Sequence, residues 1–375
     1  MNFEFSPEQL ELRSQARRYL TDKSPSSLVR TALENPGSFN KDLWEGIGEM
    51  GFLGAAIPEE YGGLGLGYLE LCVIAEEVGR AISPVPMLSS IYLAAEIIKH
   101  AGTDAQKKKW LPALASGEVI GCLATAEGKG VVTPAKIQLS AQGGVLNGTK
   151  APVLDGGIAQ IAIVLARGTS GSDARGLSLY LVDLSGPGVT RTPVATIDES
   201  RGQAELAFNG AKAELLGAAG EGWRLYEDAL DRAAVLTAFE QIGGADRALE
   251  MGRDYALERF AFGRQIGSFQ AIKHMLADMY VSATLARSNA YYGAWALSVD
   301  SPELAEAAAT ARVSATKAFQ HCAKNNIQVH GGMGFTWAFD CHLYYRRSNL
   351  LALALGSLSE WEDKLIERLR NKNAA

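Results

Sequence analysis

Apolar residues along the first third of the chain recur at the three- and four-residue spacing of amphipathic helices. Ser6, Pro7 and Gln9 form a helix start signal: an N-cap serine, a proline at the first helical position and a glutamine three residues after the cap. The pattern predicts a first helix beginning at Pro7 and further helices over Lys41–Met50, Tyr68–Val78, Met87–His100 and Ala105–Ala115. We therefore predict an N-terminal helical domain over residues 1–117.

Between residues 118 and 215 the pattern changes to short apolar runs bounded by glycine and asparagine, which is typical of strands and tight turns. The runs of strand length are Ile137–Ala141, Gly144–Leu146, Ile161–Ala166, Leu177–Val182 and Ala204–Phe208. This middle block is predicted to be a small β barrel or sandwich, and we favour the barrel.

After Gly220–Trp223 the helical periodicity returns and continues to the end of the chain. Four segments, 223–257, 266–299, 302–328 and 357–371, are long enough for a four-helix bundle. The predicted fold class is therefore mainly α with a central β domain: an N-terminal helical domain (1–117), a middle β barrel (118–215) and a C-terminal four-helix bundle (216–375).

The composition argues against several classes of protein. The 375-residue chain has 36 Lys and Arg against 42 Asp and Glu, a net charge of −6, which argues against a nucleic-acid-binding surface. Its apolar stretches are shorter than the ~18 residues that a membrane span requires. The acidic amino-terminal segment does not resemble a signal peptide, so we expect a cytoplasmic protein. The four scattered cysteines predict reduced, mostly buried thiols.

Several common site motifs are absent from the sequence. The five histidines form no HExxH motif, and His321-Cys322 and Cys341-His342 lack the spacing of a zinc site, so no metal is expected. The glycine-rich segment Tyr61–Gly67 lies between predicted helices, whereas a dinucleotide-binding loop must follow a strand. We interpret it as a turn.

Two segments of the C-terminal region carry possible binding chemistry. Arg259 precedes a glycine-interrupted connection between two long helices, and an arginine can hold a phosphate with two hydrogen bonds. Gly331 and Gly332 follow another long helix, where their backbone N–H groups can approach a ligand. Taken alone, each segment also fits a plain helix connection with a surface arginine or a C-cap.

Together with other segments, these motifs resemble those of the acyl-CoA dehydrogenase family over essentially the whole chain. The matching segments are Met50–Gly54, Pro58–Gly63, Leu146–Lys150, Gly220–Trp223, Arg259–Gly263, Phe269–His274 and Gln328–Thr336. The resemblance implies a flavoenzyme, usually a homotetramer, with FAD lying across a subunit interface. It also implies α,β-dehydrogenation of an acyl-CoA thioester: a carboxylate removes the α-proton, the β-hydrogen leaves as hydride to FAD, and electrons pass to an electron-transfer flavoprotein.

In this family one subunit contacts the flavin ring and its neighbour holds the pyrophosphate and adenosine portion. The neighbour's half is recognisable in this sequence, apart from Ala261 in place of the usual polar residue. By this resemblance the cofactor-binding residues are Arg259, Phe262, Gln270, Gln328, Gly331 and Gly332.

The flavin-ring half departs from the family pattern. The family's T-E-P-x-x-G-S-D loop is represented by Ala126–Val131, and its Gly-Ser-Asp portion is deleted. In the K-x-W-I-T motif that follows, Pro152 and Leu154 replace the tryptophan and the threonine, and neither side chain can donate a hydrogen bond to a flavin.

The catalytic glutamate is also missing from the positions where the family places it. Leu355 occupies the commonest position, Ala233 the alternative one, and Ala338 a third. Asp228 and Asp231 are nearby substitutes for the alternative position, although a solvated helix face accounts for them better. The catalytic residue therefore stays unassigned.

Since the losses affect the flavin-ring half and the base but not the half offered to a neighbour, we expect a subunit of a heteromeric acyl-CoA dehydrogenase. Bacterial α2β2 enzymes of this kind often act on bulky steroid side-chain CoA thioesters. The expected partners are an acyl-CoA, a second acyl-CoA dehydrogenase subunit and an electron-transfer flavoprotein. Two alternatives remain open: a homomeric enzyme with a relocated base, and a non-catalytic scaffold homologue.

Overall fold

The structure, a computed structural model, describes residues 5–37, 39–169 and 171–374, and the first four residues of the amino-terminal segment lie outside that range. The chain forms two compact units that each combine distant parts of the sequence. The first unit contains residues 1–29, 69–83 and 234–375, and the second contains residues 30–68 and 84–233. Each unit is described separately below.

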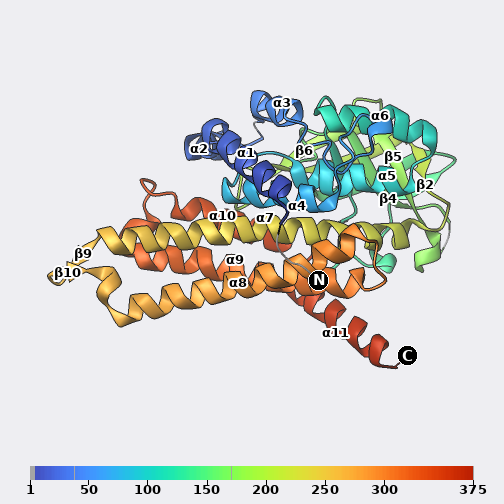
Figure 1. The fold of residues 1–375 in the computed structure, drawn as a ribbon. Coiled ribbons are helices and arrows are strands. Elements are labelled where there is room, and N and C mark those ends of the chain that lie inside the picture. The colour runs from blue at the N-terminus through green and yellow to red at the C-terminus, as the bar shows by residue number, and fades with distance from the viewer. Residues whose placement is uncertain (1–4, 38, 170, 375) are drawn as a thin grey trace. The chain divides into compact units, whose positions relative to one another are not determined.

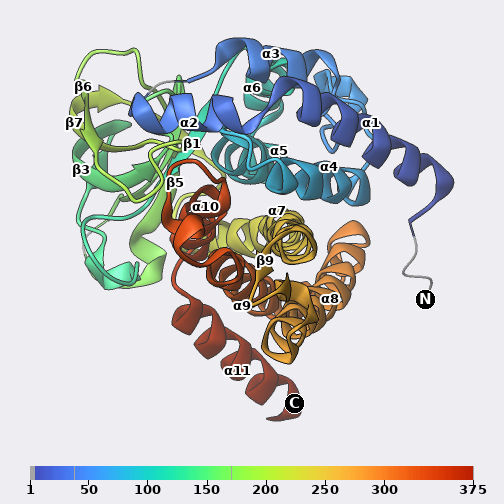
Figure 2. The same ribbon diagram turned by 90° about the vertical axis from the view of Figure 1, so that its left-hand side faces the viewer.

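The first unit is helical. Its helices are α1 (Pro7–Lys23), α4 (Tyr68–Arg80), α8 (Gln270–Ser298), α9 (Leu304–His330), α10 (Cys341–Leu353) and α11 (Leu358–Ala374). Helix α7 (Gly222–Glu258) belongs to this unit from residue 234 onward, and its first turns belong to the second unit. The predicted start of α1 is confirmed, because the Ser6 hydroxyl accepts from Gln9 N while the Gln9 side chain accepts from Ser6 N. Figures 1 and 2 show α7, α8 and α9 side by side.

Small residues allow these helices to approach closely. A Cβ on Gly293 of α8 would lie 3.2 Å from Val235 of α7 and 3.3 Å from Ala311 of α9. A Cβ on Gly244 of α7 would lie 2.4 Å from the ring of Phe319 of α9. The three helices therefore share one tightly packed core.

The second unit combines short helices with a sheet. The helices are α2 (Ser26–Glu34), α3 (Lys41–Glu49), the π-helix η2 (Met87–Ala95), α5 (Glu96–Ala101) and α6 (Asp104–Ser116). The strands are β1 (Gly121–Ala124), β2 (Ser140–Gln142), β3 (Val145–Leu154), β4 (Ile161–Arg167), β5 (Leu177–Asp183), β6 (Val189–Val194), β7 (Gln203–Lys212) and β8 (Glu214–Leu216). The chain is thus mainly helical with a sheet domain, in agreement with the predicted fold class.

The sheet corrects one part of that prediction, because it is not closed into a barrel. Its strand order is β6-β7-β3-β2-β4-β5-β8, with β1 pairing in parallel with β4. Among the described residues the two edge strands, β6 and β8, do not pair with each other. The physical reason lies in these strands: β8 has only 3 residues, and β6 is half-exposed and contains Pro193, which is typical of an edge. The three-domain boundaries and the four-helix bundle stay predictions.

Other whole-chain expectations can be compared with the described residues. All four cysteines are buried free thiols, as predicted. No described helix is long and apolar enough to cross a membrane. Within residues 5–37, 39–169 and 171–374, no group of three or more His, Cys, Asp or Glu side chains is placed to hold a metal ion.

Candidate functional site

A two-residue hairpin joins α7 to α8 in the first unit. Strands β9 (Phe260–Ala261) and β10 (Arg264–Gln265) pair antiparallel, and the turn residues Phe262 and Gly263 have φ values of 52° and 79°. Two successive positive φ values are those of a type I′ turn, whose twist suits a hairpin. A phenylalanine is strained there, and its side chain is 94% exposed. Strain and exposure at one residue point to a functional surface.

Arg259 begins the hairpin and presents an exposed cation. Its backbone N–H donates to the Tyr255 carbonyl, and its own carbonyl accepts from Ile266 N at 2.8 Å. In the part of the chain that the structure describes, its guanidinium forms no ion pair, whereas Arg253, two turns earlier on α7, pairs with Asp254 at 2.7 Å. Arg259 is therefore able to bind an anion supplied from outside the chain.

The second predicted segment follows α9. Gly331 has φ 58° and ψ −139°, a conformation essentially restricted to glycine. A Cβ on Gly331 or Gly332 would meet nothing within 4 Å, whereas one on Gly334 would lie 2.6 Å from the Ile327 carbonyl. The backbone at Gly331 and Gly332 is thus open to an approaching ligand, while Gly334 anchors the loop to α9.

Aromatic packing brings the two segments to the same end of the first unit. The ring of Tyr255 on α7 stacks on that of His330 on α9, with centroids 4.1 Å apart, and Phe339 contacts both rings. Arg259 lies one turn beyond Tyr255, and Gly331 directly follows His330. We call this region the hairpin end; Figure 1 shows it with β9 and β10.

All six predicted cofactor-binding residues are exposed. Four of them, Arg259, Phe262, Gly331 and Gly332, lie at the hairpin end, Gln328 lies on the last turn of α9, and Gln270 begins α8 directly after the hairpin. Their binding of FAD stays a prediction, but their exposure on one helical unit is compatible with a shared ligand surface.

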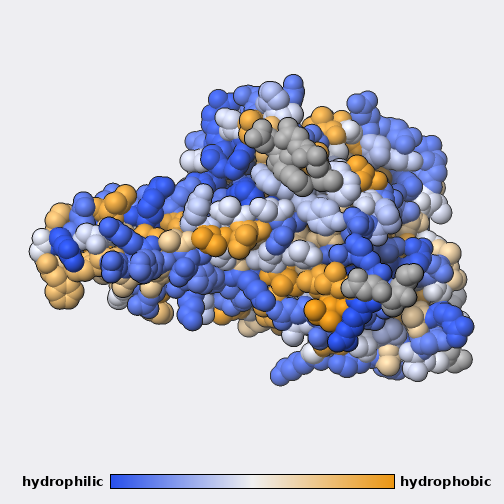
Figure 3. All heavy atoms as spheres, turned by 60° about the horizontal axis from the view of Figure 1, so that its bottom comes forward, coloured by the Kyte–Doolittle hydropathy of each residue, from blue (hydrophilic) through white to orange (hydrophobic). Residues whose placement is uncertain are grey.

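Large apolar side chains are also exposed at the hairpin end. Phe260 is 63% exposed, Phe335 80% and Trp337 47%, in addition to Phe262. Figure 3 shows hydrophobic side chains at the surface of this end, at the left of the view. Clustered exposed aromatic residues are characteristic of surfaces that another molecule covers.

The segments that represent the flavin-side motifs lie in the second unit and are engaged by the protein itself. Glu127 accepts from Lys150 Nζ at 2.6 Å and from the backbone N–H groups of Gln138 and Leu139 at 2.8 and 3.1 Å. Lys150 is fully buried and also donates to the Thr125 carbonyl. Burial lowers the pKa of Lys150 to about 8, although Glu127 opposes the shift. This pair ties the segment that follows β1 to strand β3.

The Lys150 shift predicts a change of stability with pH. The pKa of Lys150 is about 8 in the folded chain, against an ordinary value of 10.5. Between pH 8 and 10.5 the unfolded chain therefore binds more protons than the folded chain. The free energy of unfolding should therefore rise between pH 8 and 10.5, and this group contributes at most about 3 kcal/mol to the rise. Lys150→Met should lack this rise relative to the unmodified chain in urea titrations at pH 7.5, 9 and 10.5. Parallel pH profiles for the two proteins would contradict the assignment.

The positions where the family places its base offer no carboxylate. Leu355 is 4% exposed, and its carbonyl accepts from Trp361 Nε1 at 2.9 Å. Ala233 is fully buried and Ala338 is exposed on a loop. Of the two substitutes, Asp228 is exposed and paired with Arg224 at 2.7 Å, as expected for a solvated helix face. That interpretation is wrong for Asp231, which is buried because its side of α7 packs against the protein.

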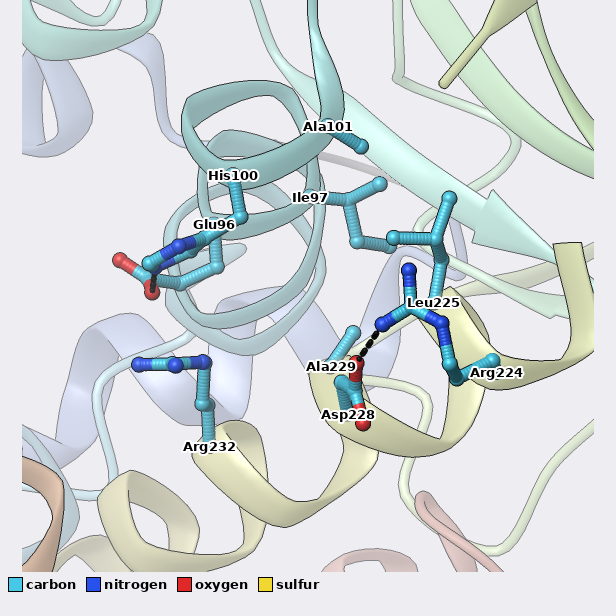
Figure 4. Close-up of a pocket in the computed structure, with 9 residues that line it drawn as sticks. All are labelled: Glu96, Ile97, His100, Ala101, Arg224, Leu225, Asp228, Ala229 and Arg232. Atoms are coloured by element: carbon cyan, nitrogen blue, oxygen red, sulfur yellow. Dashed lines mark hydrogen bonds and ion pairs between the residues drawn. The ribbon is translucent and has the colours of Figure 1, made fainter. Parts of the chain in front are cut away.

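The second unit also contains a pocket that no sequence motif predicts. Its cavity of about 230 Å³ lies between α5 and the first turns of α7 (Figure 4). The lining residues are Glu96, Ile97, His100, Ala101, Arg224, Leu225, Asp228, Ala229 and Arg232. Glu96 and His100 occupy one face of α5 at an i, i+4 spacing, which is the one local signal of the site in the sequence.

Comparison with known protein families decides the identity of the fold. Residues 6–118 match the acyl-CoA dehydrogenase N-terminal domain, and residues 220–362 match the acyl-CoA dehydrogenase C-terminal domain. The chain belongs to the acyl-CoA dehydrogenase family. The resemblance found in the motifs is thereby confirmed.

Individual members of the family include relatives that cover nearly the whole chain. The acyl-CoA dehydrogenase IpdE2 of Mycobacterium tuberculosis is 34% identical over 335 residues, covering 88% of each protein. Among solved structures, a variant of the Tcur3481–Tcur3483 steroid ACAD has a TM-score of 0.88 at 30% identity, covering 98% of this chain and 99% of its own. The ChsE4–ChsE5 complex from Mycobacterium tuberculosis has a TM-score of 0.88 at 27% identity, covering 99% of both chains.

Proposed function

We propose that this chain is one subunit of a heteromeric acyl-CoA dehydrogenase and supplies the half of the FAD site that holds the pyrophosphate. The flavin-ring contacts and the catalytic base then belong to a different subunit. The observation that carries the proposal is the contrast between the two half-sites. Arg259 presents an exposed guanidinium, whereas Pro152, Leu154 and Leu355 stand where the family has hydrogen-bond donors and a base.

The residues at the hairpin end fit the anionic part of FAD. The guanidinium of Arg259 provides charge-assisted donors for a pyrophosphate, and Gly331 and Gly332 leave their backbone open. The flavin-side segments do not fit the ring, because Glu127 and Lys150 are committed to each other. Bound FAD would supply the redox chemistry of α,β-dehydrogenation, while this chain holds and orients its phosphates.

Two relatives support a heteromer, since ChsE4–ChsE5 is a complex of two named chains and the Tcur3481–Tcur3483 protein is a steroid ACAD with two named components. By this analogy we propose that the substrate is a bulky acyl-CoA such as a steroid side-chain CoA thioester. We also propose an electron-transfer flavoprotein as the electron acceptor and the cytoplasm as the location.

Flavin content tests the proposal directly. The chain purified alone should be colourless and show no acyl-CoA dehydrogenation, because it lacks the flavin-ring contacts and a base. Co-expression with a neighbouring gene of the same family should yield a yellow complex with flavin absorbance and turnover. A yellow, active lone chain would support a homomeric enzyme instead, and a chain that never binds flavin in any complex would support a scaffold.

Replacing Arg259 by alanine in the complex should weaken FAD binding by about tenfold or more, since losing one charge-assisted contact costs about 1.5–3 kcal/mol. The matched control is Arg253→Ala, which removes an exposed arginine of α7 that already pairs with Asp254. Flavin retention during dilution and gel filtration measures the effect. Equal retention by both variants would refute the role of Arg259, and equal melting temperatures would show that folding is preserved.

A further inference from the structure

The pocket between α5 and α7 has a polar wall whose hydrogen bonds can be assigned. Glu96 is 3% exposed, and the Lys99 ammonium is the main group that lowers its pKa to about 2 against the effect of burial, so its carboxylate is ionised. It accepts from Tyr68 Oη at 2.7 Å. Since the single hydroxyl proton of Tyr68 points to Glu96, the Tyr68 oxygen accepts from its other neighbours.

This assignment fixes the tautomer of His100. Its Nε2 lies 2.9 Å from Tyr68 Oη and must therefore donate, as Arg232 Nη1 does at 3.3 Å. In the neutral ring, Nδ1 is then the acceptor. Among the described residues Nδ1 of His100 has no hydrogen-bond partner, although His100 lines the cavity. One acceptor of the wall is thus available to a ligand.

The rest of the lining restricts the chemistry of that ligand. The charged residues that line the cavity are two cations, Arg224 and Arg232, and two anions, Glu96 and Asp228. The two signs balance, and Arg224 already pairs with Asp228 as Glu96 does with Lys99, so the lining favours neither a carboxylate nor an ammonium ligand. The side opposite His100 and Arg232 combines the apolar residues Ile97 and Leu225 and two alanines with the Arg224–Asp228 ion pair (Figure 4). The His100 side chain is 42% exposed, and a purely hydrocarbon ligand would make no hydrogen bond with it or with Arg232.

We propose that this pocket is a ligand site for an uncharged, hydroxyl-bearing hydrocarbon group, with His100 accepting from the hydroxyl and Arg232 donating to it. A cavity of about 230 Å³ has room for a six-membered ring with one substituent. The site lies wholly in the second unit, whereas the residues that we assign to FAD lie in the first. It therefore does not depend on the proposed function, and it can be tested on the isolated chain.

Saturation-transfer NMR of the isolated chain with cyclohexanol tests the site. Cyclohexanecarboxylate, cyclohexylammonium and methylcyclohexane serve as probes of the same ring with a different substituent. We expect cyclohexanol to bind with millimolar affinity and the other three at least fivefold more weakly. Arg232→Met should weaken cyclohexanol binding at least fivefold, while Arg175→Met, which changes an exposed arginine elsewhere in the same unit, should leave it unchanged.

A second pocket variant keeps the test decisive if Arg232→Met fails to fold. Ala101→Phe places a ring in the cavity from its half-exposed rim and should abolish cyclohexanol binding without loss of the melting transition. Absence of cyclohexanol binding, equal binding of a charged or hydrocarbon probe, or full binding by both pocket variants would each overturn the proposal. None of these results bears on whether the complex binds FAD.

Discussion

Replacing Gly243 by alanine is expected to lower the free energy of unfolding by about 3 kcal/mol. Gly243 lies where α7 crosses α4 in the first unit, and a Cβ there would lie 1.8 Å from the Glu76 carbonyl oxygen and 2.8 Å from Arg80 N. The contact is reciprocal, because a Cβ on Gly79 of α4 would lie 1.8 Å from the Glu240 carbonyl oxygen. Both obstacles are helix backbone, so the helices must move apart to admit a methyl group.

The contact between α4 and α7 also positions a cluster of buried ion pairs. These ion pairs would be displaced if α4 moved away from α7. Glu76 is 1% exposed and pairs with Arg13 at 2.6 Å and with Arg287 at 3.0 Å. Its neighbour Glu77 pairs with Arg17 at 2.8 Å. Displacing buried carboxylates from their partners adds to the cost of the steric clash, because a buried charge is strongly disfavoured without its partner.

Gly252→Ala is the matched control on the same helix. A Cβ on Gly252 would meet only Leu276 at 3.5 Å and Asn326 at 3.6 Å or beyond, which are ordinary contacts. Alanine also favours a helix over glycine by about 1 kcal/mol. Urea denaturation should therefore show Gly252→Ala as stable as the unmodified chain or more stable. Equal midpoints for the two variants would mean that α4 and α7 are not in backbone contact.

The sequence predicted elements well where periodicity and local end signals agreed. The N-terminal helix and the helices now seen as α3, α4 and α6 fall into this group, and Gly62 in the Tyr61–Gly67 segment indeed forms a left-handed turn with φ 78°. The segment Met87–His100 was expected to be one helix but divides into the π-helix η2 and α5. It is buried almost throughout, so no polar face marked the change of helix type.

Elements whose stability comes from distant partners were missed. Strand β1 contains only 4 residues and is defined by its pairing with β4, and β6 carries a polar pattern with a proline. Helix α10 follows a glycine-rich loop and buries Arg347 and Ser348, which do not appear apolar in the sequence. In each case the deciding contacts lie far away along the chain, where periodicity gives no information.

The two candidate sites, the hairpin end and the pocket, also differ in how far the sequence could predict them. The arginine and the glycines of the hairpin end could be recognised because each lies in a short contiguous motif of the sequence. The pocket could not, because Arg232 reaches Tyr68 from a different part of the chain and no local pattern links these residues to His100. Contiguous motifs therefore pointed to the surface that we propose binds FAD, while the structure was needed to bring the pocket residues together.

The substitution Leu355→Glu is expected to restore no activity to the isolated chain and to lower its stability. Leu355 is 4% exposed between α10 and α11. A glutamate buried there would have a raised pKa and would cost several kcal/mol unless it found a partner. Under the proposed function, a carboxylate in this position would still lack a flavin opposite it, since the side chains of Pro152 and Leu154 cannot donate hydrogen bonds to the ring.

Leu353→Glu is the matched control, because it adds the same charge at an exposed position. Leu353 lies two residues earlier and is 67% exposed, so a glutamate there should leave the melting temperature of the isolated chain nearly unchanged. Thermal denaturation and turnover on a panel of acyl-CoA thioesters measure both variants. If Leu355→Glu alone produced flavin-dependent dehydrogenation by the isolated chain, its flavin site would have to be complete. The heteromeric proposal would then give way to a homomeric enzyme that had lost only its base.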